Sequence, residues 1–272
     1  MLSTRMKMML LMSSLFLLYA VGCSDSDGGN AMYAQPTDED REDIAEDFGT
    51  ALAGEEEGML GMWHDGGTTL TDRTGTRALD DTLTVEHGGF TMVRIRDFYD
   101  VNDIWSEFYI PGVTARMVQT LTVEGTRESV SGNRSVTVSH ADTLDITGLL
   151  LTDEIKYING NGDRNVEGEF RSRFRQNVRT FESHYDWTVT DLQIHNDREE
   201  HPYPLDGTIS VQGVWINTHT NPGRDFEQSV LFSFEIYFDG TRYAELVFEN
   251  GATFWIDLDN GWCWYDRPGG MG

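Results

Sequence analysis

From Leu83 onward, apolar and polar residues alternate with a period of two, and turn-forming residues interrupt the alternation at short intervals. This pattern predicts strands with one buried side and one solvent-facing side. About ten such segments follow one another, and no helical pattern separates them. The sequence therefore predicts an all-β fold of mainly antiparallel strands, a sandwich or a barrel-like sheet, as a single domain over residues 63–272.

Residues 166–189 carry the clearest alternation, in two runs that flank Gln176-Asn177. A two-residue loop at that step places residue 168 opposite residue 185. In this register one face collects the apolar side chains of both strands: Val166, Phe170, Phe174, Phe181, Tyr185, Trp187 and Val189. We therefore expect one dry face and one wet face along this hairpin.

Three dipeptides, Asp239-Gly240, Asn250-Gly251 and Asn260-Gly261, punctuate the C-terminal third of the chain. Asx-Gly steps between alternating runs predict tight turns between antiparallel strands. Matching the apolar faces on either side of the first turn requires Phe238 to oppose Arg242, which leaves a three-residue loop.

Residues 38–62 predict one helix ahead of the strands. Asp38 or Asp40 can cap it, and acidic residues in its first turn suit the helix dipole. Its apolar positions recur every four residues, at Ile44, Phe48 and Leu52. Because this stripe is narrow, we expect the helix to lie against the sheet or to cover the end of a barrel.

The first 22 residues have the form of an export signal. Arg5 and Lys7 supply positive charge, Met8 to Ala20 form an apolar run, and small residues follow. The apolar run is too short to cross a bilayer, which takes about 18 to 20 residues, so we expect residues 1–22 to be removed.

The tetrapeptide Ala20-Val21-Gly22-Cys23 resembles the lipobox of bacterial lipoproteins. The resemblance implies that the signal is cut before Cys23, that this cysteine is lipidated, and that its acyl chains hold the protein in the membrane. Ser24 beside it implies an outer-membrane lipoprotein of the cell envelope, and residues 23–37 would form a flexible tether. The alternative is an ordinary secretory signal in which Cys23 has no role.

The chain is strongly acidic, with 46 Asp and Glu against 20 Lys and Arg. The formal charge of −26 becomes −28 once Arg5 and Lys7 leave with the signal, and such a surface repels nucleic acid. Lys156 is then the single lysine. This composition resembles that of proteins from salty environments, although a genome rich in G and C would also replace lysine by arginine.

The densest group of metal-ligand side chains lies in one short segment. It consists of His195, Asp197, Glu199 and His201. Imidazole and carboxylate groups together bind zinc and other divalent ions. The spacing is not that of a helical zinc motif, and Pro202 and Pro204 favour a solvated connecting loop as the alternative.

Residues 100–111 break the period of two and carry three aromatic residues, Trp105, Phe108 and Tyr109. Aromatic side chains on a loop are typical of a recognition loop, here a candidate ligand-binding site over an apolar cavity. The alternative is that they fold under the sheet as part of its core.

The sequence carries no catalytic or cofactor motif, such as a G-x-S-x-G elbow, a P-loop or a C-x-x-C pair. We therefore expect a lipid-anchored envelope protein with a structural or binding role, no cofactor, and an unknown protein or apolar small molecule as partner. The alternatives are a carrier of an apolar ligand in a barrel or half-barrel, and a surface hydrolase.

If the acidic composition is an adaptation to salt, added NaCl should raise the melting temperature. At 1 M salt the Debye length falls to about 3 Å, which relieves the repulsion between carboxylates. Thermal unfolding followed by circular dichroism between 0.1 and 2 M NaCl measures this. A melting temperature that stays constant or falls would contradict the salt hypothesis.

Overall fold

The computed structural model describes residues 33–53, 59–60, 82–87, 89–128, 134–171, 178–197, 200–221 and 224–265. The chain divides into two units, Met1–Met32 and Tyr33–Gly272, and every described residue belongs to the second. The expected signal, the lipobox and Cys23 therefore lie outside the described residues.

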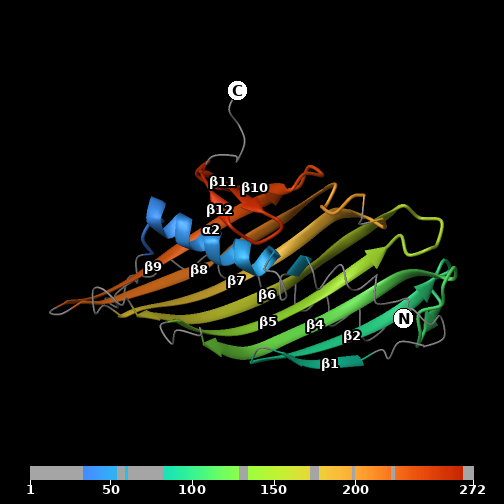
Figure 1. Ribbon diagram of the computed structural model, residues 1–272, viewed down its shortest axis with the longest axis horizontal. Helices are drawn as coiled ribbons and strands as arrows, with labels where there is room; N and C mark the ends of the chain where they lie inside the picture. Colours follow the sequence, from blue (N-terminus) through green and yellow to red (C-terminus); the bar gives the residue numbers. More distant parts are fainter. Residues whose placement is uncertain are drawn as a thin grey trace, which may run out of the picture. The chain divides into compact units, whose positions relative to one another are not determined.

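The described part of the chain folds into one twelve-stranded sheet and one main helix (Figure 1). The elements are α2 (Asp38–Ala53), β1 (Thr82–His87), β2 (Phe90–Asp100), β3 (Trp105–Ser106), β4 (Thr114–Glu128), β5 (Arg134–Thr147), β6 (Ile155–Arg171), β7 (Val178–His195), β8 (Asp206–Asn221), β9 (Arg224–Tyr237), β10 (Tyr243–Phe248), β11 (Thr253–Asp257) and β12 (Cys263–Trp264).

The strands form an antiparallel meander that follows the order of the chain, except that β2 pairs with β4. The short strand β3 lies off this path and pairs only with β2. The expected all-β, antiparallel fold with an N-terminal helix is confirmed. The sheet is open: among the described strands, β1 and β12 are its two edges, and it is not closed into a barrel.

The hairpin of β6 and β7 has the expected faces but a different register. Gly168 pairs with Phe181, and Tyr185 pairs with Arg164, whereas the sequence suggested that residue 168 would face Tyr185. The predicted register was wrong by four residues. Val166, Tyr185, Trp187 and Val189 are all at most 2% exposed, so the predicted dry face is correct. A register shift by an even number of residues leaves every side chain on the same face of the sheet. The alternation of apolar and polar residues therefore cannot distinguish the two registers.

Glycines opposite large rings favour the observed register. Gly162 pairs with Trp187, and Gly168 pairs with Phe181. A Cβ atom on either glycine would overlap the ring of its partner. The rings of β7 thus lie over the bare backbone of β6, which is possible only when glycine stands directly opposite each ring.

The three Asx-Gly steps are turns, as expected. Gly240, Gly251 and Gly261 have φ values of 79°, 86° and 76°, in the region that glycine adopts without strain. Across the first turn, however, Ile236 opposes Leu246. The predicted pairing of residues 238 and 242 was wrong by two residues, and the apolar faces again match because the shift is even.

Helix α2 begins at Asp38, as the sequence predicts, but its cap is the preceding residue. The Thr37 hydroxyl accepts a hydrogen bond from the Asp40 amide (3.2 Å), and the Asp40 carboxylate accepts one from the Thr37 amide (2.9 Å). This reciprocal pair is a capping box. Met59 and Leu60 are also helical, and residues 54–58 and 61–62 of the expected helix lie outside the described residues.

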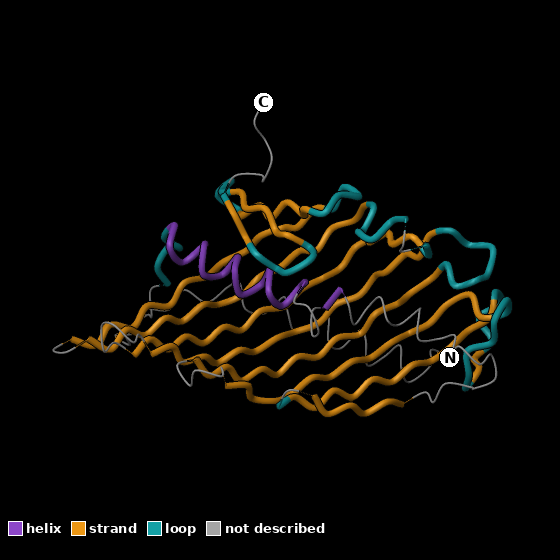
Figure 2. Tube along the Cα trace, in the orientation of Figure 1, coloured by secondary structure: helices purple, strands orange, loops and turns teal. Residues whose placement is uncertain are grey.

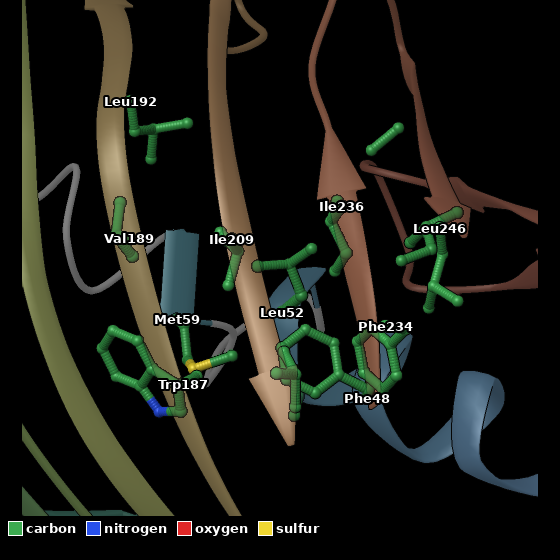
Figure 3. Close-up of a cluster of buried hydrophobic side chains, with 14 of the residues drawn as sticks. Phe48, Leu52, Met59, Trp187, Val189, Leu192, Ile209, Phe234, Ile236 and Leu246 are labelled. Carbon is green, nitrogen blue, oxygen red and sulfur yellow. The ribbon is translucent and has the colours of Figure 1, made fainter. Parts of the chain in front are cut away.

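The helix lies across one face of the sheet, and this face, called here the inner face, carries the core (Figure 1). The ring centroid of Phe48 lies 5.4 Å from that of Tyr185 on β7 and 5.1 Å from that of Phe234 on β9. Leu52 and Met59 join the same cluster (Figure 3). The expectation that the helix lies against the sheet is confirmed.

Residues in β12 and just after it also hold the helix. The Cys263 thiol donates to the Ala45 carbonyl (Sγ to O, 3.0 Å), and the Tyr265 hydroxyl donates to the Asp38 carbonyl (3.3 Å). Burial raises the pKa of the Cys263 thiol to about 12, so this cysteine packs as a small neutral side chain. Among the described residues, no helix is long and apolar enough to cross a membrane.

Replacing the central ring of the helix should destabilise the whole fold. Phe48→Ala should lower the free energy of unfolding by about 3 to 5 kcal/mol, because it removes a fully buried ring that packs the helix against β7 and β9. Urea unfolding followed by circular dichroism measures this. The exposed helix position Glu42 supplies the control: Glu42→Ala should change the value by no more than about 0.5 kcal/mol. Equal values for the two variants would show that the helix does not hold the core.

Candidate functional site

The connections β2–β4, β5–β6, β7–β8 and β9–β10 all lie at one end of the strands, because every second connection of a meander falls at the same end. We call these connections, together with the β11–β12 turn, the loop end. It comprises residues 101–113, 148–154, 196–205, 238–242 and 258–262, of which 198–199 are not described. Figure 2 shows loops gathered along this end of the sheet.

Hydrogen bonds join neighbouring loops of this end. The Asn196 side-chain amide donates to the Asp153 carbonyl (2.6 Å), and the Gly240 amide donates to the Pro204 carbonyl (3.0 Å). Backbone groups of one loop thus satisfy polar groups of the next. The loop end is a connected surface.

The loop between β2 and β4 is fixed by its own side chains. The Asp100 carboxylate accepts hydrogen bonds from the backbone amides of Asn102 (2.8 Å) and Ile104 (2.9 Å). Chiefly the bond from Ile104 lowers the pKa of Asp100, so the carboxylate is ionised at neutral pH and holds the turn. Asp103 adopts a left-handed conformation, with φ of 61°.

Arg116 on β4 ties this loop to the neighbouring strand. Its guanidinium donates two hydrogen bonds to Asp145 (2.7 and 2.8 Å) and one to Asp103 (2.8 Å). It also lies over the ring of Tyr99, 5.0 Å from the centroid. A planar guanidinium shared by two carboxylates and a ring fixes orientation as well as charge.

The three aromatic residues predicted as a recognition site divide into two groups. Tyr109 folds inward: its ring centroid lies 6.1 Å from that of Phe98 in the core, and its hydroxyl donates to the Leu149 carbonyl (3.4 Å). Trp105 points outward and is 55% exposed, with its indole N–H donated to Asp97 (3.0 Å). Phe108 is also exposed. Tyr109 thus folds under the sheet, as the alternative interpretation expects, while the recognition role of Trp105 and Phe108 stays a prediction.

Further exposed apolar side chains lie on the same loop and on the β5–β6 loop, and we call the whole set the apolar tip. It consists of the exposed side chains Val101, Ile104, Trp105, Phe108, Ile110, Val113 and Leu151. Leu151 belongs to the β5–β6 loop, is 74% exposed, and reaches the other loop near Gly112. The sequence prediction missed Leu151, although the apolar run Leu149-Leu150-Leu151 before a turn was a usable signal.

Of the predicted metal ligands, His195 ends β7, and Asp197 and His201 lie in the β7–β8 connection. The rings of His195 and His201 approach each other, with centroids 4.3 Å apart. The His195 Nδ1 atom already accepts a hydrogen bond from the Asp197 amide (2.9 Å), and Glu199 lies outside the described residues. No group of three or more His, Cys, Asp or Glu side chains suited to a metal ion occurs in the part of the chain that the structure describes. The metal site stays a prediction.

A buried polar pair on the inner face was not foreseen from the sequence. The His140 Nε2 atom lies 3.0 Å from an Asp142 carboxylate oxygen, and both side chains are at most 1% exposed. The His140 ring stacks on Trp187, with centroids 6.0 Å apart. Two polar residues on the apolar parity of β5 were the available signal. The pair is sealed from solvent on the inner face.

The opposite, outer face of the sheet carries a shallow groove of about 540 Å³ over β7 to β10. Its lining side chains are mostly polar or acidic: Asp186, Thr188, Ser210, Gln212, Ser233, Glu235, Val247 and Glu249, with Val211, Phe234 and Phe248 beneath. This chemistry differs from the Phe- and Trp-lined cavity that a carrier of apolar molecules requires.

Comparisons of this chain with protein-family models, with curated proteins and with solved structures give no match.

Proposed function

We propose that this protein is a lipid-anchored protein of the bacterial cell envelope with a non-catalytic binding role, and that it binds its partner through the apolar tip. The observation that carries the proposal is the gathering of seven exposed apolar side chains on two adjoining loops. Single exposed apolar residues are common on protein surfaces, but a contiguous group marks an interaction site.

The fixed conformation of the loops supports a binding role. Asp100, Arg116 and the inward Tyr109 hold the β2–β4 loop through hydrogen bonds and packing. A surface that is ordered before binding loses less conformational entropy when a partner arrives. Polar bonds and one aromatic ring thus hold this loop in a conformation that leaves apolar side chains exposed to solvent. A loop with only a structural role would not require this.

The anchor rests on the sequence. The lipobox-like Ala20-Val21-Gly22-Cys23 supplies one lipidated cysteine, and three acyl chains exceed the two signals that stable anchoring needs, at about 0.8 kcal/mol per buried methylene. With residues 23–37 as a tether, the folded domain would reach partners in or beside the membrane.

The two alternatives have less support. For a carrier, the space over the inner face between β7 and β9 is already filled by Phe48 and Leu52 of α2. For a hydrolase, a general acid needs a carboxyl group with a raised pKa. Asp257 and Asp100 do not suit that role, because hydrogen bonds from Arg242 and from backbone amides, respectively, lower their pKa values.

The anchor makes a testable prediction about the two cysteines. In the native host, the chain should incorporate labelled palmitate and stay with the membrane after a wash with 1 M NaCl, because acyl chains do not respond to salt. Cys23→Ser should abolish the label. Cys263→Ser, the control, should label like the unmodified chain, since this thiol is packed against the helix. Labelling of Cys23→Ser would contradict the proposal.

The binding role is tested by photo-crosslinking in living cells. A photoreactive phenylalanine analogue at position 108 or 151 should give one reproducible adduct, because both positions lie in the apolar tip. The same analogue at position 262 is the control, since the exposure of Trp262 (65%) lies between those of Phe108 (38%) and Leu151 (74%) and this residue lies in the β11–β12 turn. An adduct at position 262 alone, or none at any position, would contradict a binding role for the tip.

A further inference from the structure

We infer that the occupant of the apolar tip is a protein whose apolar groove is bordered by arginine or lysine. The inference rests on the proposed function and specifies the chemistry of the partner. The observation behind it is a set of carboxylates around the tip, which we call the acidic rim: Asp97, Asp103, Glu107, Asp145, Asp153 and Glu154.

The acidic rim is in direct contact with the apolar centre. The Asp97 carboxylate accepts the indole N–H of Trp105 (3.0 Å). Glu107 lies between the exposed Trp105 and Phe108 in the chain, and Glu154 is exposed three residues after Leu151. A partner that covers Trp105, Phe108 and Leu151 must therefore also cover these carboxylates or lie beside them.

The two loops of the tip carry no positive charge of their own. Loops 101–113 and 148–154 contain no lysine or arginine. Arg116 binds Asp103 and Asp145 and so neutralises part of the charge, but it leaves Asp97, Glu107 and Glu154 uncompensated by that guanidinium. The tip is thus an apolar centre in a negative border.

This arrangement is that of a protein–protein interface, with an apolar core and a polar rim. Rim charges contribute to the rate of association and to the choice of partner, because opposite charges attract at a distance and like charges exclude wrong partners. The favoured partner therefore offers guanidinium or ammonium groups at the border of an apolar groove. Arginine suits this place well because it pairs with carboxylates in two-point geometry.

The same rim disfavours two other occupants. A second copy of this chain would bring two negative borders together, and the formal charge of each chain is −26. An anionic membrane surface would be repelled by the rim for the same reason, within a Debye length of about 8 Å at physiological salt. Both occupants are outcomes that the experiment below separates.

The test uses the full chain in its native envelope, with the photoreactive analogue at position 108. Mass spectrometry of the adduct identifies what is crosslinked: a peptide of another protein, a peptide of this chain, or a lipid. The inference expects a peptide with apolar residues flanked by arginine or lysine. It is overturned by a lipid adduct, by a second copy of this chain, or by a partner segment without basic residues.

A pair of charge variants gives the second readout. Glu107→Gln together with Glu154→Gln should lower the yield of the adduct about fivefold, since two rim contacts with opposite charges are removed. The matched control is Glu182→Gln together with Glu227→Gln, which removes two exposed carboxylates away from the tip. Equal yields for the two double variants would overturn the inference even when a protein is crosslinked.

Failure of the inference and failure of the proposed function give different results. Without any adduct at positions 108 and 151, the binding role itself is wrong. With an adduct that is a lipid, a second copy, or insensitive to the rim variants, the tip does bind, and only the assigned partner chemistry is wrong.

Discussion

The packing of helix α2 against the inner face of an open sheet, over β7 and β9, is the contact on which this part of the structure depends. A sheet in one layer has two faces, and an apolar face must be covered to exclude water. Over β7 and β9, helix α2 covers this face with Phe48 and Leu52, while β12 holds the helix through Cys263 and Ala45. Helix α2 and strand β12 thus close this part of the core together, although more than 200 residues separate Ala45 from Cys263.

The sequence predicted the strands, their faces and the helix start, but not the registers of two hairpins. The period of two assigns Val166 and Tyr185 to the inner face in either register, and it cannot distinguish pairings that differ by an even number. What distinguishes them is volume: Trp187 requires Gly162 beneath it, and Phe181 requires Gly168. Pairing each glycine of β6 with a large ring of β7 would have corrected the β6–β7 register from the sequence alone.

The candidate site, too, was predictable from the sequence only in part. The break in alternation identified the loop of Trp105 and Phe108, because aromatic residues outside a strand pattern need another explanation. Tyr109 turns inward because Phe98 and the Leu149 carbonyl offer it a partner for both ring and hydroxyl. Leu151 joins the site from another connection, about 40 residues along the chain, and only the meander topology brings the two loops to one end.

The polar contacts of the loop end explain how apolar side chains stay exposed in a stable protein. Left free, Trp105 and Leu151 would gain by collapsing onto nearby apolar surface. Asp100 fixes the turn, Arg116 fixes its far side, and the indole N–H of Trp105 is bound by Asp97, so Asp97 and Asp103 both make the region acidic and restrain it. Part of the charge that selects a partner is therefore supplied by groups that also hold the tip open. A substitution that neutralises Asp97 or Asp103 would change both at once, which is why the charge of this surface is better probed at Glu107 and Glu154.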